Sequence, residues 1–235
     1  FMSVFRFKYF EVQQKNASMN VGFDAMILGA LTEVKSQLNI LDIGTGTGVL
    51  SLMLMQKNEN SMITAIDIDE QNVQIAKNNF LSSDWSSQMN SFHIDLFKYK
   101  TDIKHDLIIT NPPFFLDSLT SPDTRNSNAK HFKKSDLSLF FKLCYSWIKE
   151  FGDLWMITSV DHELEWMENA KMNGFNLKKK WNIYGKPGLH NRSVLNFSKS
   201  EVKHTIENNL LVRDKNGIYT DDYKSLTREY HGVFI

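Results

Sequence analysis

Asn111 lies in the part of the sequence that points most directly to chemistry. It follows an apolar strand, Asp106 to Thr110, and begins the run Asn111, Pro112, Pro113 and Phe114. An exocyclic or amide nitrogen is a poor nucleophile because its lone pair is delocalised. The Asn111 oxygen and a carbonyl of the proline pair would accept hydrogen bonds from such an –NH2 group, while Phe114 stacks on the planar ring. We interpret the run as a site for methylating a planar amine; a strand ending in a proline-rich turn is the alternative.

A glycine-rich turn follows an earlier apolar strand. The run Leu41 to Gly48 places glycines at alternate positions, Gly-x-Gly-x-Gly, preceded by the acidic residue Asp42. Glycines let the backbone turn tightly and approach a ligand, and the helix that follows offers N–H groups to anionic groups. The dinucleotide fingerprint is Gly-x-Gly-x-x-Gly, so this spacing fits S-adenosylmethionine better. We assign cofactor contacts here to Gly44, Thr45, Gly46 and Gly48.

Three aspartates are expected at the carboxyl ends of successive strands. Asp42 could hold the cofactor's ammonium, Asp67 its two ribose hydroxyls and Asp95 its adenine amino group, and we include Ile68 and Leu96 beside them. In open α/β sheets, ligands bind in the crevice outside these strand ends. Each acid alone could be a helix cap or a solvated loop residue. Their agreement with Asn111 on one edge predicts a single pocket.

Composition limits the possible partners and compartments. The 235 residues include 27 basic and 27 acidic side chains, so any nucleic-acid contact must come from a local patch. The single cysteine, Cys144, excludes an internal disulfide and favours a reducing compartment. No apolar run approaches the roughly 20 residues of a membrane span, and the N-terminus reads as a strand rather than a secretory leader. The cytoplasm is the expected location.

The pattern of elements predicts an α/β fold. Strands and helices alternate from Asn39 onward, which indicates a Rossmann-like, mostly parallel, doubly wound sheet; we expect seven strands with an antiparallel edge strand. Residues 1–37 are expected to form a small hairpin and helix extension, with Asp24 as the helix N-cap, over a core of residues 38–235. Leu137 to Ile148 is the clearest amphipathic helix and places Cys144 on its buried face. We expect one methyltransferase domain, residues 1–235.

Several segments resemble one family in order along nearly the whole chain. The chain is similar to the YfiC family, the tRNA1(Val) (adenine(37)-N6)-methyltransferases, which are class I S-adenosylmethionine enzymes. The similar segments are Phe7 to Phe10, Met19 to Ala30, Leu41 to Gly48, Asn111 to Phe115, Gly185 to Pro187, Gly217 to Thr220 and Leu226 to Tyr230.

This resemblance implies methyl transfer to the N6 amine of an adenine in the anticodon loop of a tRNA. It also implies that Val21 to Asp24 covers the cofactor, which adds Gly22 and Asp24 to the cofactor contacts. For contacts to the RNA we select Phe115, Arg125, Lys130, Lys186 and Arg192. Residues 178–180 are lysines on an expected strand, so neighbours point to opposite faces and cannot act as one cluster.

No metal or general base is expected, because a sulfonium donor is already activated and the proton can leave after transfer. His162-Glu163 begins like a zinc-binding helix, but Trp166 occupies the position of the second ligand. Other acceptors for Asn-Pro-Pro-aromatic sites remain open: guanine N2 or adenine in ribosomal RNA, adenine in DNA, or a glutamine amide. A non-catalytic module that binds cofactor or RNA is the alternative of another class. No obligate protein partner is implied.

Overall fold

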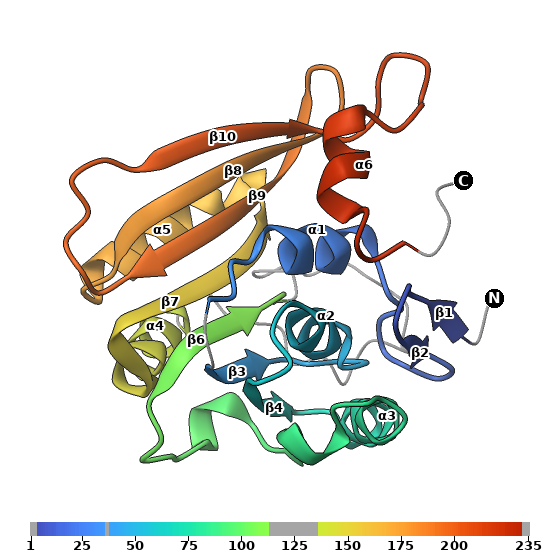
Figure 1. Cartoon of the computed structure of the whole chain (residues 1–235). Helices are drawn as coiled ribbons and strands as arrows, with labels where there is room; N and C mark the ends of the chain where they lie inside the picture. Colours follow the sequence, from blue (N-terminus) through green and yellow to red (C-terminus); the bar gives the residue numbers. More distant parts are fainter. Residues whose placement is uncertain (1–3, 36–37, 113–135, 232–235) are drawn as a thin grey trace, which may run out of the picture.

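A computed structural model of the chain describes residues 4–35, 38–112 and 136–231, and Figure 1 shows their arrangement. Eight strands form one sheet: β3 (Asn39–Ile43), β4 (Met62–Asp67), β5 (Met89–His93), β6 (His105–Thr110), β7 (Ile148–Ser159), β8 (Asn176–Lys186), β9 (Leu189–Ser198) and β10 (Ile206–Leu211). Their spatial order is β10-β8-β9-β7-β6-β3-β4-β5. The expected Rossmann-like, mostly parallel sheet is confirmed.

Two details of the expected sheet were wrong. The described sheet has eight strands rather than seven, and its antiparallel strand, β9, lies inside the sheet between β7 and β8. A tight turn at Gly188, with φ of 75°, joins β8 to β9 and makes them an antiparallel hairpin. Because β9 runs against its neighbours, the short connection after it returns β10 parallel to β8 at the edge.

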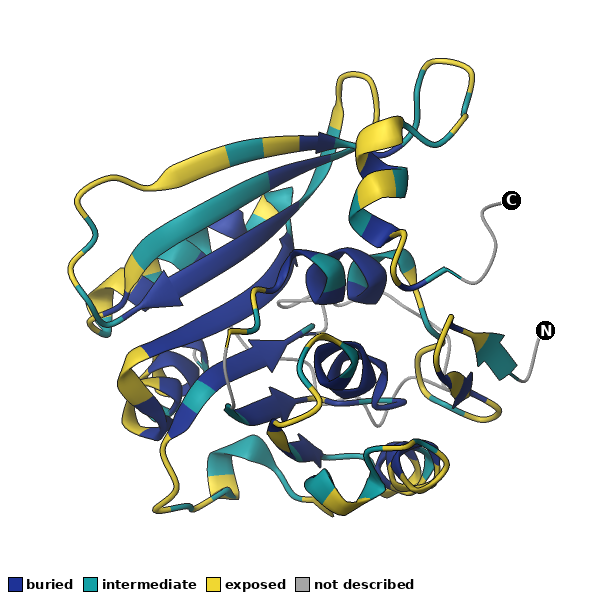
Figure 2. Cartoon of the chain, viewed as in Figure 1, coloured by how far each residue is buried: buried dark blue, intermediate teal, exposed yellow. Residues whose placement is uncertain are grey.

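Helices cover both faces of the sheet. One face packs against α1 (Phe23–Leu31), α2 (Val49–Lys57), α3 (Glu70–Leu81) and α6 (Asp221–Thr227), and the other against α4 (Leu137–Trp147) and α5 (Glu163–Met172). Short 3₁₀ turns are η1 (Ser86–Gln88), η2 (Leu96–Lys98) and η5 (Val160–His162). Strand residues alternate between the two cores: Ile40 lies under α1 and α2, and Leu41 under α4 and α5. Figure 2 shows the central strands and α2 almost wholly buried.

The N-terminal residues form the expected hairpin and helix. Strands β1 (Val4–Arg6) and β2 (Glu11–Gln13) pair antiparallel and lead to α1. The side chains of Phe7, Phe10 and Val12 are buried in the core that also contains α2. Helix α1 begins at Phe23 with Gly22 as its N-cap, so Asp24 is not the cap.

Individual side chains in and near the other helices can be placed as well. The Asp69 carboxylate caps α3 by accepting a hydrogen bond of 2.8 Å from the Gln71 N–H. Cys144 is fully buried in α4, as its place on the apolar face of that helix predicts, and burial raises the pKa of its thiol. Asp161 lies inside η5, directly before α5. Within the described residues, no helix has the length and apolar character needed to cross a bilayer.

Candidate active site at the carboxyl edge of the sheet

Five polar side chains lie on one face of the sheet, at the edge where β4, β3, β6 and β7 end and the antiparallel strand β9 begins. In spatial order they are Asp67 on β4, Asp42 on β3, Asn111 after β6, Ser159 on β7 and Arg192 on β9. Side chains two positions apart on a strand share a face. The residues two positions further into each strand all belong to the core beneath α1 and α2: Ala65, Ile40, Ile109, Ile157 and Val194. Strand order and alternation thus gather these polar groups along what we call the carboxyl edge.

The glycine-rich turn connects β3 to α2 at this edge. Gly44, Gly46 and Gly48 have φ of 72°, 55° and 81°, which only glycine adopts without strain. The N–H groups of Gly44 and Thr45 both donate to the Ile66 carbonyl, at 2.8 and 3.1 Å. A Cβ at Gly44 or Gly46 would have no described atom within 4 Å, whereas one at Gly48 would lie 2.5 Å from Phe80. Space beside the first two glycines therefore suits a ligand, and Gly48 permits close helix packing.

Asp42 is buried beneath this turn. Its Oδ2 accepts hydrogen bonds of 2.7 Å from the hydroxyls of Thr45 and Ser51. Its Oδ1 is also buried and has no hydrogen-bond partner within the described part of the chain. Burial raises the pKa of Asp42 to about 6, against the lowering effect of the two hydroxyls. The orphaned oxygen is suited to a cationic or hydrogen-bonding group that is not part of the chain.

Asp67 ends β4 and holds the turn from the side. Its Oδ2 accepts from the Gly46 N–H at 2.8 Å, and its Oδ1 accepts from the Asp69 N–H at 2.9 Å. Burial raises its pKa, and these two N–H groups oppose the rise. The carboxylate is thus fixed in place at the mouth of the turn.

Asn111 lies on the strand beside the glycine turn. Ile43 and Thr110 are directly paired across β3 and β6, and the Thr110 hydroxyl donates to the Ile43 carbonyl at 2.9 Å. The next residues, Gly44 and Asn111, therefore lie side by side. The Asn111 Oδ1 is buried and has no hydrogen-bond partner among the described residues. Pro112 is buried, and Pro113, Phe114 and Phe115 lie outside the described residues.

A family model described as "Methyltransferase small domain" matches residues 23–158, more than half of the chain. The chain belongs to this family. Curated relatives extend the likeness to its full length. A protein of Pedobacter heparinus is 31% identical over 99% of both chains, and one of Bacteroides thetaiotaomicron is 33% identical over 97% of this chain and 96% of its own. Both relatives are named tRNA1(Val) (adenine(37)-N6)-methyltransferase.

Solved structures confirm the methyltransferase fold at low sequence identity. A predicted O-methyltransferase from Agrobacterium tumefaciens has a TM-score of 0.69 at 14% identity, covering 90% of this chain and 98% of its own. A ribosomal protein L11 methylase from Lactobacillus delbrueckii has a TM-score of 0.58 at 17% identity, covering 81% and 84%. Together with the sheet order, these neighbours establish the class I methyltransferase fold.

Eight of the site residues expected from sequence lie in or beside the glycine turn at the carboxyl edge. These are Asp42, Gly44, Thr45, Gly46, Gly48, Asp67, Ile68 and Asn111. Asp95 was expected to end the third strand, but β5 ends at His93. The Asp95 carboxylate instead accepts a hydrogen bond of 3.0 Å from the Phe97 N–H and caps η2. The Ile94 N–H donates to the Asp67 carbonyl at 2.9 Å, which keeps Asp95 and Leu96 near the end of β4.

Asp24 and Arg192 form an ion pair that sequence reasoning did not foresee. The Arg192 Nε donates to both Asp24 carboxylate oxygens at 3.1 Å and joins the first turn of α1 to β9. Burial raises the pKa of Asp24, and the guanidinium opposes that rise. Arg192, selected as a contact for RNA, and Asp24, selected for the cofactor, therefore contact each other at the carboxyl edge.

The lysines of β8 differ in their partners. Lys178 pairs with Asp153 at 2.9 Å, Lys179 with Glu33, and Lys180 with Glu163. These pairings on opposite sides of the strand confirm that the three lysines do not form one cluster. Lys186 is exposed at the end of β8, whereas Arg125 and Lys130 lie outside the described residues.

Three further residues at the site were missed. Asn72 and Asn79 on α3 contact the residues around the glycine turn, and the buried Ser159 Oγ has no hydrogen-bond partner in the described ranges. Asn72 and Asn79 are separated by seven residues, two helical turns, so they share a face. A polar pair at this spacing on the apolar face of a helix was the available signal.

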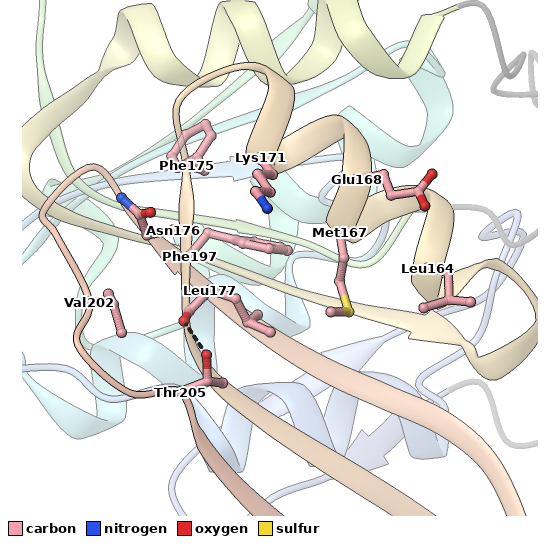
Figure 3. Close-up of a pocket in the computed structure, with 10 residues that line it drawn as sticks. All are labelled: Leu164, Met167, Glu168, Lys171, Phe175, Asn176, Leu177, Phe197, Val202 and Thr205. Atoms are coloured by element: carbon pink, nitrogen blue, oxygen red, sulfur yellow. Dashed lines mark hydrogen bonds between the residues drawn. The ribbon is translucent and has the colours of Figure 1, made fainter.

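The hollow shown in Figure 3 lies away from this edge. It has a volume of about 320 Å³ and lies between α5 and the far ends of β8 and β9, with largely apolar walls that include Met167, Phe175 and Phe197. Among the described residues there is no cluster of three His, Cys, Asp or Glu side chains that could hold a metal ion. The carboxyl edge remains the place where polar groups of the right kind converge.

Proposed function

We propose that this protein transfers a methyl group from S-adenosylmethionine to the N6 amine of an adenine in the anticodon loop of a tRNA. One observation carries the proposal: the buried Asn111 Oδ1, which has no hydrogen-bond partner among the described residues, lies beside the glycine turn, on the same face as Asp42 and Asp67. This arrangement supports a hydrogen-bond acceptor for an amine next to a pocket for a methyl donor. The names of the full-length relatives support adenine N6 as the acceptor and tRNA as the substrate. Such a reaction belongs in the cytoplasm.

The residues present fit S-adenosylmethionine. The orphaned Oδ1 of Asp42 suits the ammonium of the amino-acid part, and the open space beside Gly44 and Gly46 admits the chain that bears it. We propose that Asp67 binds the ribose hydroxyls and that Asp95 and Leu96 contact the adenine; the Ile94 N–H bond to the Asp67 carbonyl, which keeps these residues near one another, supports this assignment. When bound, the cofactor supplies a methyl group already activated by a positively charged sulfur. We therefore propose that the reaction needs no metal ion.

The chemical work of the chain is alignment. In this proposal the Asn111 Oδ1 accepts a hydrogen bond from one N6–H and the Pro112 carbonyl accepts the other; Pro112 itself has no N–H that could compete for the base. These two bonds hold the amine with its lone pair directed at the cofactor side. Their acceptor oxygens stabilise the positive charge that develops on N6 as the new bond forms. The surplus proton then leaves to solvent.

The acceptor side continues along β7 and β9. Thr110 pairs with Met156, so Ser159 lies on the strand beside Asn111, about 5 Å to the side and about 7 Å further along. That gap matches a flat base, and the Ser159 hydroxyl is suited to bond its ring edge. Splaying an adenine out of a loop costs roughly a few kcal/mol, and stacking on Phe114 would return about 1–3 kcal/mol. Arg192 pairs with Ser159 across β7 and β9, and Lys186 is exposed at the end of β8; we propose that both contact the flanking RNA.

Nucleoside analysis tests the proposal. The purified protein is incubated with methyl-labelled S-adenosylmethionine and total tRNA that lacks its native modifications, and the tRNA is then digested. Label in N6-methyladenosine supports the proposal. Label in guanine or cytosine moves the reaction to another acceptor, and absence of label with intact cofactor binding favours a non-catalytic module.

A further inference from the structure

The N-terminal segment, residues 11–22, is held against α3 by two asparagines. Asn79 is 1% exposed, and its Oδ1 accepts a hydrogen bond of 2.8 Å from the Gln13 N–H. Its Nδ2 donates to two carbonyls, Gln13 at 3.0 Å and Thr47 at 2.8 Å. Thr47 lies in the glycine turn. One side chain therefore joins the N-terminal segment to the turn proposed to hold the cofactor.

Asn72 makes a second link of the same kind. Its Oδ1 accepts from the Ser18 N–H at 3.2 Å and the Ser18 hydroxyl at 3.0 Å, and its Nδ2 contacts that hydroxyl at 2.7 Å. The same Nδ2 lies 3.4 Å from the Oδ2 of Asp67, the oxygen that also accepts from the Gly46 N–H. Asn72 is 5% exposed. It thus connects the N-terminal segment with the carboxylate proposed to hold ribose.

Both links have the same polarity. In each, the amide oxygen accepts from the N-terminal segment, and the amide nitrogen donates both to that segment and to the cofactor side. The N-terminal segment has an internal link as well, because the Val21 N–H donates to the Gln14 side chain at 2.9 Å. Directly after the segment, Asp24 pairs with Arg192 on β9. A change in position of the glycine turn or Asp67 therefore acts directly on the backbone of residues 13–18.

We propose that Asn72 and Asn79 are positioning residues that couple the order of the N-terminal segment to cofactor binding. A ligand that fixes the glycine turn and Asp67 stabilises the segment, and by thermodynamic reciprocity an ordered segment raises affinity for that ligand. Neither asparagine touches the reacting atoms. The proposal rests on the proposed function for the identity of the ligand, S-adenosylmethionine or its product S-adenosylhomocysteine.

Asn72→Ala and Asn79→Ala test the coupling, with Asn78→Ala as the matched control. Asn78 is on the same helix but exposed, and its side chain accepts a hydrogen bond from the Gln74 side chain, not from the N-terminal segment. We expect S-adenosylhomocysteine to bind each test variant about tenfold more weakly by calorimetry, since two or more hydrogen bonds are lost. The KM for S-adenosylmethionine should rise while kcat changes less than about twofold. Binding by both test variants equal to that of Asn78→Ala overturns the proposal.

Hydrogen exchange in the protein without substitutions gives a readout that does not depend on whether a variant folds. S-adenosylhomocysteine should slow exchange of the Gln13 and Ser18 amides, whose protons are donated to Asn79 and Asn72. Equal exchange with and without saturating ligand overturns the coupling. A protein that binds S-adenosylhomocysteine and shows this protection but leaves tRNA unmethylated contradicts the proposed function alone. A protein that does not bind the ligand contradicts both.

Discussion

The two halves of the carboxyl edge differ in how completely their polar groups are bonded. In the cofactor half, formed by β5, β4, β3 and the glycine turn, both Asp67 oxygens and one Asp42 oxygen accept hydrogen bonds from the chain. In the acceptor half, formed by β6, β7, β9 and β8, the Asn111 Oδ1 and the Ser159 Oγ are buried without a described partner. One half is largely satisfied by the protein itself, and the other leaves polar atoms for a partner.

This difference suits what each half is proposed to bind: the cofactor in one half and an RNA base in the other. The chain's own hydrogen bonds hold the carboxylates of the cofactor half in place, so the ligand would add order to the glycine turn and to residues 11–22 rather than reshape the pocket. Buried polar groups without partners are unfavourable, and native structures retain them mainly where function requires them. The acceptor half is therefore the half in which substitutions should affect the reaction more than the fold.

The largest effect is expected for Asn111→Ala. Loss of the acceptor for N6–H should reduce kcat/KM by about 2–4 kcal/mol of transition-state stabilisation, roughly 30- to 1,000-fold. The free energy of unfolding should change little, because the Asn111 oxygen has no described partner to lose. Methyl transfer to tRNA and chemical denaturation measure the two quantities.

Calorimetry with S-adenosylhomocysteine is the control for this variant. The affinity should stay near that of the unmodified protein, because Asn111 belongs to the acceptor half. Near-normal turnover by Asn111→Ala would remove this residue from the mechanism, and loss of cofactor binding would erase the distinction between the two halves.

Asp42→Asn tests the cofactor half through its pH dependence. The folded pKa of Asp42 is about 6, above its ordinary value of 3.8, so the folded state binds more protons between these two values. Stability without cofactor should therefore fall as pH rises through this window, by at most about 2–3 kcal/mol, and stay at the lower level above it. The Asn variant should lack this dependence and be the more stable protein at pH 7 to 8.

Cofactor affinity should show the opposite trend. The ionised carboxylate attracts an ammonium, so binding to the unmodified protein should strengthen as pH rises through about 6. Asp42→Asn should bind more weakly at pH 8 by about 1.5–3 kcal/mol, the range for hydrogen bonds to charged groups. Equal affinity of the two proteins at pH 8 would exclude Asp42 as the ammonium contact.

The sequence identified the parts of the edge that depend on local pattern. A strand followed by Gly-x-Gly-x-Gly and a helix predicts a ligand-binding turn at Gly44 to Gly48, and acids at strand ends indicate Asp42 and Asp67. Asp24 and Arg192 are 168 residues apart, and only the tertiary fold brings them together. The position of β9 inside the sheet was missed because hydrophobic alternation gives the faces of a strand but not its neighbours. Asn72 and Asn79 were missed because their partners Ser18, Gln13 and Thr47 are 54, 66 and 32 residues away along the chain, and only the tertiary fold brings them together.

Ser159→Ala should have a smaller effect than either carboxyl-edge variant above. If the Ser159 hydroxyl bonds the target base, its loss should lower kcat/KM for tRNA by about 0.5–1.5 kcal/mol, roughly two- to tenfold. Stability should be unchanged or slightly higher, because the hydroxyl is buried without a described partner. Unchanged kinetics together with higher stability would show that Ser159 has no contact with the substrate.

Lys186→Ala and Lys179→Ala form the finest comparison, because both lysines belong to β8. Lys179 pairs with Glu33, whereas Lys186 is exposed at the strand end nearest the acceptor half. Removing one phosphate contact from a single-stranded RNA site should lower the slope of log K against log salt by about 0.7. We expect that change, with affinity a few-fold weaker, only for Lys186→Ala. Equal slopes for both variants would mean that the RNA does not extend along β8, and that its path from Asn111 runs toward another strand.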